Sequence, residues 1–442
     1  MMRPRRLALA TVAVLTVAVL GYTRSRPAVA ESVPPLRMGR TTSQADLTQT
    51  VDAARRRLAA APGDATAAVA LADALLRLSR VESDAQHALD AERALQQALR
   101  HEPGEYTALK MLGAVYLSQH RFRDAVGAAT RATAVNAKDA WNFGVIGDAS
   151  MELGEYERAF TAFDTMARLR PDAAAYGRVA YAHEVQGRLE EALRHMRRAA
   201  EATSAHDPES LAWHYAQIGH LHLELGAVDA AEREYARAEY TFPNHPYALN
   251  GLARVAAARQ DYATALRRYR ALLDAAPTPE LAATVGDLLA VTGSHDAARA
   301  MYARAEALER EGWAAEEPQP AALARMLAER GLKAGDAVAL AEKAAATRRD
   351  IFTMDALAMS YYRAGRLEEA AGAAREAVRT GSRNRHILYH AAAIAHARGD
   401  DAAARRWLAN LPAGRAPEPL LAAAVAELSL ALGEKIEARN GN

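Results

Sequence analysis

Apolar and small residues recur along the chain with a period of about 34 residues. Four copies carry a glycine directly after a branched apolar residue, at Gly113, Gly147, Gly219 and Gly286. Around these glycines, apolar residues lie three or four positions apart, which is the spacing of one helix face. A second, alanine-rich helical pattern follows each copy after a short break. The pattern therefore predicts pairs of helices, and its regular return indicates a repeat array.

The residue types within one copy fit two helices that cross closely. Glycines in the first helix and alanines such as Ala125 and Ala159 in the second allow the two backbones to approach. Large residues such as Tyr116, Phe163 and Tyr235 then fill the space between neighbouring pairs. Because one pair cannot bury its apolar face alone, we expect the stability of the array to come from stacking of successive pairs.

These copies, with a large–Leu–Gly–Tyr first helix and an Ala–Phe–Ala–Pro second helix, resemble the tetratricopeptide repeat. The resemblance covers roughly residues 65–415 and implies an all-α fold, a right-handed superhelical solenoid of antiparallel helix pairs with about nine to ten repeats. The low aromatic content of 6% and the many alanines also favour close-packed helices over a β-core. The pattern is degenerate near residues 311–348, where we expect a hinge close to Pro318.

Both ends of the array carry additional helical patterns. Residues 45–64 predict a lone N-terminal capping helix, and residues 416–442 predict a C-terminal capping helix and tail. Repeat arrays need atypical units at their ends, because the outermost apolar faces have no neighbour to cover them.

The first thirty residues have the three parts of an export signal. Arginines precede the uncharged apolar run 7–21, and the small triplet Ala28-Val29-Ala30 follows. The run is short for a membrane span, so we expect cleavage after Ala30, export across the cytoplasmic membrane and release or retention in the cell envelope. The alternative is an uncleaved anchor, with residues 7–21 attaching the protein to the membrane. Residues 31–44 predict a flexible linker, since Pro34-Pro35 and a Ser/Thr cluster oppose regular structure.

Charge and composition narrow the classes of function. The 55 basic and 54 acidic residues leave a formal net charge of +1. The chain therefore has no overall positive electrostatic potential that would attract nucleic acid. The chain has no cysteine, so disulfides and thiolate chemistry are excluded. No phosphate loop, nucleophile elbow or HExxH motif occurs. His214, His220 and His222 do not share one helix face. We therefore expect no catalytic residues, no metal and no cofactor, and a protein that is not an enzyme.

In proteins with this type of repeat, the first helices of successive pairs line a concave groove that takes a peptide. The resemblance therefore implies a protein or peptide partner, and it places side chains at groove-facing positions of this chain. These positions are Lys110, Trp141, Asp148, Tyr181, Glu184, Trp213, His220, Tyr247, Asn250 and Arg254, continuing to Phe352, Asp355, Tyr362 and Arg363. Aromatic residues interspersed with arginine and acid are typical of partner-binding surfaces. The alternative is that these side chains only cover the inner wall of the array.

Three functions are compatible with the sequence. The first is a non-enzymatic scaffold outside the cytoplasm that binds a partner protein or peptide in the groove. The second is a membrane-anchored assembly or maturation factor for an envelope complex. The third is an enzyme with an unrecognised site in the groove around His220 and Glu224.

Overall fold

The computed structural model describes residues 44–82, 86–313 and 320–433. The expected export signal, most of the linker, the expected hinge near Pro318 and the C-terminal tail lie outside the described residues. The described part of the chain is entirely helical apart from short turns, which confirms the all-α prediction.

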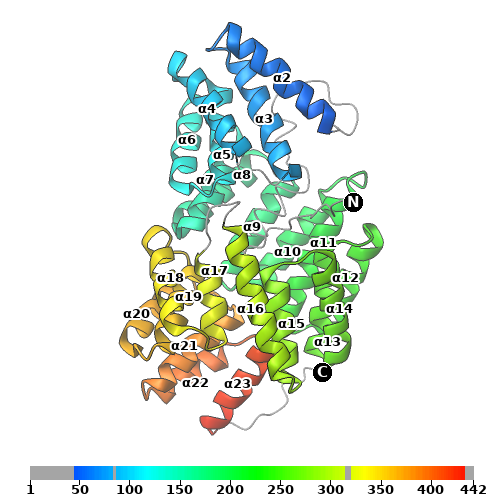
Figure 1. The fold of residues 1–442 in the computed structure, drawn as a ribbon, viewed down its shortest axis with the longest axis vertical. Coiled ribbons are helices and arrows are strands. Elements are labelled where there is room, and N and C mark those ends of the chain that lie inside the picture. The colour runs from blue at the N-terminus through cyan, green and yellow to red at the C-terminus, as the bar shows by residue number, and fades with distance from the viewer. Residues whose placement is uncertain (1–43, 83–85, 314–319, 434–442) are drawn as a thin grey trace. The chain divides into compact units, whose positions relative to one another are not determined.

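Helices follow one another in pairs along the described chain (Figure 1). The helices are α2 (Gln44–Ala60), α3 (Ala65–Glu82), α4 (Gln86–His101), α5 (Tyr106–Ser118), α6 (Phe122–Val135), α7 (Ala140–Leu153), α8 (Tyr156–Leu169), α9 (Ala173–Val185), α10 (Leu189–Glu201), α11 (Pro208–Glu224), α12 (Val228–Thr241), α13 (Pro246–Ala258), α14 (Tyr262–Ala275), α15 (Pro279–Val291), α16 (His295–Gly312), α17 (Pro320–Glu329), α18 (Ala334–Thr347), α19 (Ile351–Arg363), α20 (Leu367–Ala377), α21 (Arg385–Ala397), α22 (Asp401–Ala409) and α23 (Pro419–Ala431). In the pairs from α3–α4 to α7–α8 and from α11–α12 to α21–α22, the first helix is followed by a second helix packed against it.

The described residues fall into two compact units, and the division lies within α9, after Arg178. Residues 44–178 form the N-terminal unit, and residues 179–433 form the C-terminal unit. Pairs α3–α4, α5–α6 and α7–α8 follow α2 in the N-terminal unit, and the pairs from α11–α12 to α21–α22 precede α23 in the C-terminal unit. The degenerate segment 311–348 includes one such pair, α17–α18.

Short polar signals in the sequence begin and end these helices. Asp139 precedes α7, and its carboxylate accepts a hydrogen bond from the backbone N–H of Trp141. Asp350 does the same for Phe352 and Thr353 at the start of α19. Such caps satisfy backbone donors that have no partner within the helix. At the end of α7, Gly154 adopts a left-handed conformation that stops the helix.

Close helix crossings in the N-terminal unit depend on the glycine of the repeat. A Cβ atom built on Gly147 of α7 would lie 2.2 Å from the ring of Phe163 in α8, which is a severe overlap. Phe163 itself is completely buried. The two residues therefore fit together only because the first is glycine, as expected from the sequence pattern.

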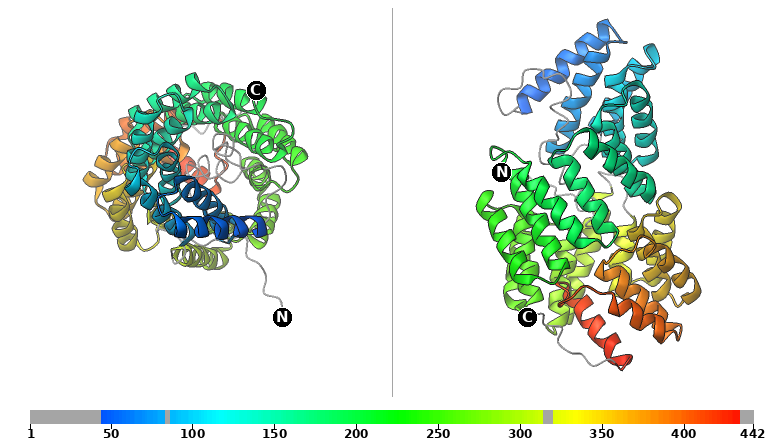
Figure 2. Two further views of the ribbon diagram at one scale, coloured as in Figure 1. Left: turned by 90° about the horizontal axis from the view of Figure 1, so that it is seen from above. Right: turned by 180° about the vertical axis from the view of Figure 1, so that it is seen from behind.

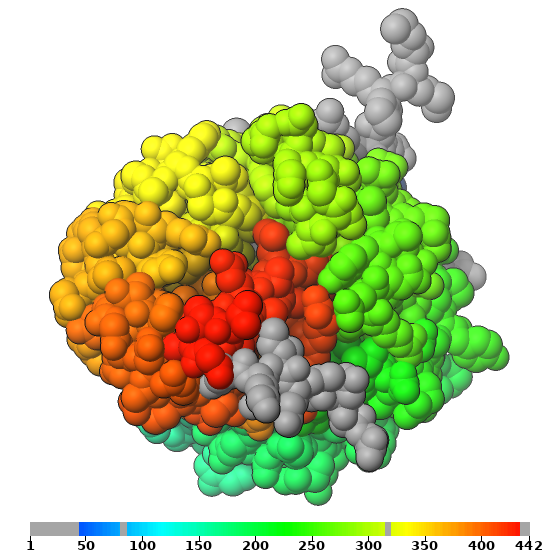
Figure 3. All heavy atoms as spheres, turned by 90° about the horizontal axis from the view of Figure 1, so that it is seen from below, coloured from blue at the N-terminus to red at the C-terminus, as the bar shows by residue number. Residues whose placement is uncertain are grey.

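The C-terminal unit turns back on itself. Gly226, after α11, lies against the backbone of Ala413, which follows α22, and Gly187 lies against the backbone of Gly381. Segments almost two hundred positions apart in the sequence are therefore in contact (Figure 2). Helix α23 packs on α21 and α22, as an end cap would, and also on α15 (Figure 3). Of its buried leucines, Leu428 packs with apolar residues of α21 and α22, and Leu421 lies beside Tyr389 of α21.

Candidate functional site

A cavity of about 270 Å³ lies inside the C-terminal unit. It is lined mainly by side chains from the first helices α11, α13, α15, α17, α19 and α21, together with two residues of the second helix α16 and the residues that begin α23. Most of the lining thus comes from the first helix of each pair. Because the repeat is about 34 residues long, side chains one repeat apart lie next to each other on this inner surface.

A chain of polar contacts crosses three neighbouring repeats on one side of the cavity. Nε2 of His220 lies 3.1 Å from Glu184 Oε1, and Nη1 of Arg254 lies 3.0 Å from His220 Nδ1. An arginine can only donate a hydrogen bond, so Nδ1 of His220 accepts the hydrogen bond from Arg254. The N–H of His220 is then at Nε2, and it donates a hydrogen bond to the carboxylate of Glu184. Arg254 also donates to Glu224 at 3.2 Å and to Glu418 at 3.0 Å.

The contact between Arg254 and Glu418 joins α13 to the residue before α23, 164 positions later in the sequence. Burial alone would raise the pKa of the Glu418 carboxyl, but Arg254, His386 and Arg385 lower it below its usual range. Burial would likewise lower the pKa of Arg254, and Glu418, Tyr235 and Glu224 raise it. The ion pair is therefore charged at neutral pH.

Arg385 holds the segment that leads into α23. Only 4% of this residue is exposed. Its guanidinium donates to the carbonyl oxygens of Pro412, Ala413 and Gly414, at 2.8 to 3.1 Å. Burial lowers its pKa, and the carboxylate of Glu224 at 3.8 Å provides a nearby negative charge. Arg385 and Arg254 thus fix the course of residues 412–418 across the unit.

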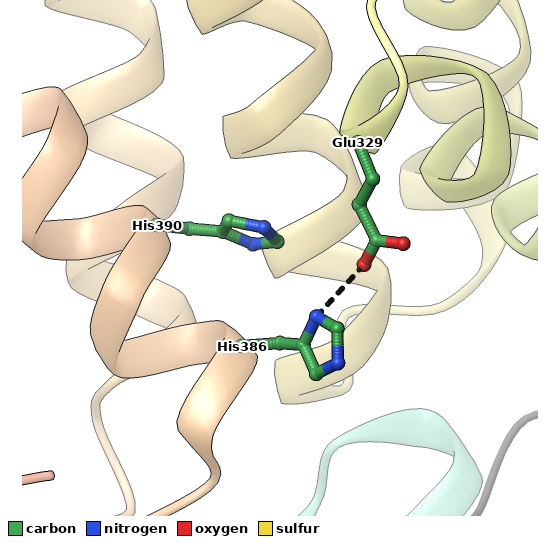
Figure 4. Close-up of side chains that lie close together, drawn as sticks. All are labelled: Glu329, His386 and His390. Atoms are coloured by element: carbon green, nitrogen blue, oxygen red, sulfur yellow. Dashed lines mark ion pairs between the residues drawn. The ribbon is translucent and has the colours of Figure 1, made fainter. Parts of the chain in front are cut away.

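Glu329, His386 and His390 form a second polar cluster on the cavity wall (Figure 4). His386 and His390 are four residues apart on α21, so they share a face of that helix. Glu329, the last residue of α17, places Oε1 3.1 Å from Nδ1 of His386. Nδ1 of His390 lies 2.9 Å from Oδ1 of Asp355 on α19, and both residues are almost completely buried. The cluster of Glu329, His386 and His390 could hold a metal ion.

The charges in this cluster are coupled. Burial by itself would raise the pKa of Glu329, but His386, Arg325 and Arg330 hold it well below its usual range. Burial by itself would lower the pKa of His386, and the negative charge of Glu329 outweighs burial and raises it. Without another cation, Glu329 and His386 therefore form an ion pair.

The structure distributes the ten predicted groove residues between the two units. In the C-terminal unit, Glu184, His220 and Arg254 are brought together in the chain of contacts described above. Tyr181 and Trp213 are buried. The two remaining residues, Tyr247 and Asn250, are half-buried, and Asn250 accepts a 3.5 Å hydrogen bond from Tyr269.

The other three predicted groove residues lie in the N-terminal unit. Lys110 forms a 2.5 Å ion pair with Asp139, and Asp148 forms one of 2.6 Å with Arg178. Trp141 is half-buried and packs against the apolar core of the unit. The continuation of the groove contains Asp355, which holds His390, Arg363, which donates to the carbonyl of Ala328, and Phe352, which lines the cavity. Tyr362 is half-buried beside the core.

Sequence reasoning missed Glu329, His386, His390 and Glu418. One signal was available, because the spacing of His386 and His390 is that of two ligands on one helix. The histidines considered instead are separate in the structure: His214 lies 3.2 Å from Thr203, and His222 lies 3.4 Å from Arg197. Glu329 and Glu418 come from other helices, and no local pattern marks them.

Comparisons with known proteins agree with the repeat pattern. The family model of the tetratricopeptide repeat matches residues 145–208, 216–279 and 356–419, which supports tetratricopeptide repeats in those segments. No curated protein matches the chain. Among the helices of the described residues, none is long and apolar enough to cross a membrane.

Several solved structures are similar to parts of the chain. The APC/C hetero-tetramer Cut9–Hcn1 has a chain 17% identical, with a TM-score of 0.44, and the match covers 73% of this chain and 60% of that one. A thermophilic TPR protein of Thermus thermophilus is 19% identical over 45% of this chain and 97% of its own, with a TM-score of 0.35. PilF of Pseudomonas aeruginosa is 17% identical over 44% and 87%, with a TM-score of 0.38. None of these similarities identifies a partner for this chain.

Proposed function

We propose that this protein is a non-enzymatic scaffold that holds a segment of a partner protein on the inner surface formed by its first helices. The observation that carries this proposal is the seat that the first helices of the C-terminal unit provide for α23. That seat combines an apolar contact for Leu421 with an arginine, Arg254, that binds the carboxylate of Glu418. A surface that accommodates a helix of its own chain has the chemistry to accommodate a helix of another protein.

The N-terminal unit offers the corresponding surface for a partner. Trp141, at the start of the first helix α7, is half-buried, so part of its ring remains accessible. Aromatic side chains of this kind, set among polar residues, provide much of the binding energy at protein interfaces. The neighbouring Asp139 and Lys110 are paired with each other. We propose that a partner segment packs an apolar side chain against Trp141.

The proposed location of this activity is outside the cytoplasm, and its support is the composition of residues 1–30. Mass spectrometry of the mature protein from its native host tests this. A chain that begins at Glu31 would indicate a released protein and would exclude the anchored alternative. A chain that retains residues 7–21 in the membrane fraction would support the anchored assembly factor instead.

Site-specific photo-crosslinking in the native host tests partner binding. A photoreactive amino acid at Trp141 should crosslink one recurring partner. The matched control position is Val135, which lies at the end of the second helix α6 and is 54% exposed. Crosslinks to that partner should be strong from position 141 and weak from position 135. Equal crosslinking from both positions would contradict the inner-surface assignment.

Substitution then measures how much Trp141 contributes. Trp141→Ala should weaken capture of the crosslinked partner by about tenfold or more, the usual effect of losing an interface aromatic residue. Trp213→Ala is a poorer probe, because Trp213 is only 5% exposed and its loss also leaves a cavity in the C-terminal unit. Because Trp141 also packs against the core of its unit, Trp141→Ala should lower the unfolding temperature. The control is therefore that the variant keeps the helicity of the parent chain at the temperature of the binding assay.

A further inference from the structure

We propose that Glu329, His386 and His390 bind one divalent transition-metal ion, with Zn²⁺ as the best fit, in the cavity of the C-terminal unit. The proposal does not depend on the scaffold function. Each residue offers one ligand atom, and the three atoms lie within 4.8 Å of one another. Ligand atoms around a tetrahedral Zn²⁺ are roughly 3.4 Å apart, as expected from bond lengths of about 2.1 Å. Closing the site therefore requires only a small inward movement of the side chains.

The ligand set matches the chemistry of zinc. Two imidazoles and one carboxylate, with a fourth position open to solvent, are a common arrangement for this ion. His386 and His390 come from one face of α21, and Glu329 faces them from α17 (Figure 4). All three residues line the cavity of about 270 Å³, which leaves room for water or another small ligand at the fourth position.

An outer carboxylate already orients one of the ligands. Nδ1 of His390 is held by Asp355, with 2.9 and 3.0 Å to its two oxygens. The hydrogen bond fixes the tautomer of His390 and leaves Nε2 with its lone pair for a metal. Figure 4 shows the ring of His390 directed toward Glu329 and His386. Metal-binding histidines are commonly held by a carboxylate in this way, and the contact makes the imidazole a better ligand.

Two arginines near Glu329 oppose the binding of a cation. Nη1 of Arg330 lies 3.3 Å from Oε2 of Glu329, and Nε of Arg325 lies 4.0 Å from Oε1. Asp287 engages Arg330 at 2.6 Å and balances much of its charge. Arg325 is partly exposed, and its long side chain can turn away from the carboxylate.

The experiment uses the purified chain without a histidine tag, stripped of metal with a chelator. Titration calorimetry should show one Zn²⁺ per chain, and Co²⁺ should give visible absorption bands of a tetrahedral site. His386→Gln and His390→Gln should each weaken Zn²⁺ binding by at least about 100-fold. This exceeds the effect of losing a residue that only orients a ligand. The matched control is His396→Gln, since His396 also lies on α21 but pairs with Asp401. It should leave the affinity unchanged.

Two further variants distinguish a metal site from a simple ion pair. Asp355→Asn should weaken Zn²⁺ binding by about 10- to 100-fold while keeping the three ligands. Arg325→Gln should tighten binding, because it removes a positive charge 4.0 Å from the Glu329 carboxylate. The tightening keeps the proposal testable even if a histidine variant does not fold. Absence of Zn²⁺ binding at micromolar concentrations, or equal affinity in the His386 and His396 variants, would overturn the proposal.

Discussion

The two units use the same helix pairs but connect them differently. In the N-terminal unit, the ion pairs Lys110–Asp139 and Asp148–Arg178 join helices of neighbouring repeats. In the C-terminal unit, Arg254 and Glu418 join repeats that are 164 residues apart. The comparison shows that one repeat pattern supports both nearest-neighbour stacking and a closure of the C-terminal unit, in which Arg254 contacts Glu418 and Gly226 contacts Ala413.

The two units also differ in what lies against the inner surface of their first helices. First helices of the C-terminal unit surround a cavity and seat α23. The surface that tetratricopeptide repeats would offer to a partner is, in this unit, partly engaged by the chain's own C-terminal segment. The N-terminal unit keeps Trp141 accessible, and for that reason the partner experiment is placed there.

Removal of α23 should produce the largest difference in stability between the two units. A chain that ends at Glu418 keeps the partner of Arg254 and loses three buried leucines, Leu421, Leu428 and Leu432. At about 2 kcal/mol for each buried leucine, the C-terminal unit should lose roughly 6 kcal/mol of unfolding free energy. Hydrogen exchange should show faster exchange in α15, α21 and α22 and unchanged exchange in α5 to α8. Uniformly faster exchange in both units would contradict a closure confined to the C-terminal unit.

Loss of the central arginine should have the next largest effect. Arg254→Ala leaves Glu224 and Glu418 without their common partner. The Glu224 side chain is only 12% exposed, and an unpaired buried charge is costly. We expect a loss of about 4 kcal/mol, measured by urea unfolding of the C-terminal unit. Removing Glu418 as well, in the double variant Arg254→Ala with Glu418→Ala, should recover part of the loss. No recovery would mean that the arginine stabilises the unit by packing alone.

Replacing Gly226 by alanine should show how much the contact with Ala413 adds to the cost of the left-handed backbone conformation. Gly226 has a φ of 78° and lies against Ala413, whereas Gly293 has a φ of 85° and no atom near its missing side chain. Gly293→Ala should therefore cost only the left-handed conformation, about 1 kcal/mol. Gly226→Ala should cost about 3 kcal/mol, because the backbone of Ala413 must also move. Equal shifts of the unfolding midpoint in the two variants would show that the closure adds no constraint.

Acidification should produce the smallest of these differences in stability between the two units. Burial lowers the pKa of His214 in the C-terminal unit to about 4. Its neutral form is therefore favoured by folding, so stability is complete above the unfolded pKa near 6.5 and falls as the pH drops toward 4. Between pH 7 and pH 5 this loss is about 2 kcal/mol. His386, whose pKa is raised, contributes in the opposite direction.

The N-terminal unit should not share this dependence through its paired carboxylate. Burial would raise the pKa of Asp139, but Lys110 and Tyr106 lower it, so its contribution is lost only as the pH falls below its usual value of 3.8. His214→Gln should reduce the pH dependence of the C-terminal unit between pH 7 and 5 without removing it, because burial also lowers the pKa of His245 in the same unit to about 4. Urea unfolding at each pH measures the change. The same slope in the variant and the parent would assign the acid sensitivity to other groups.

Much of the fold could be predicted from the sequence. The apolar periodicity indicated the helix pairs, and the glycine after a branched residue marked crossings such as Gly147 against Phe163. The prediction of groove residues identified only part of the contacts on the inner surface. It placed Glu184, His220 and Arg254 on one surface, since they are about one repeat apart, but provided no sign that Glu418 would complete their contacts. Partner binding by these residues stays a prediction.

The sequence by itself determined the repeating unit, because helix periodicity, small residues at crossings and capping residues act over one or two neighbouring helices. Only the tertiary structure decided that Gly226 meets Ala413 and that Glu329 meets His386. The physical reason is that each repeat rotates slightly against the next, and the sum of those rotations determines which distant repeats meet. No local pattern records that sum, so the closure, the cavity and the proposed metal site emerge only when the whole C-terminal unit is folded.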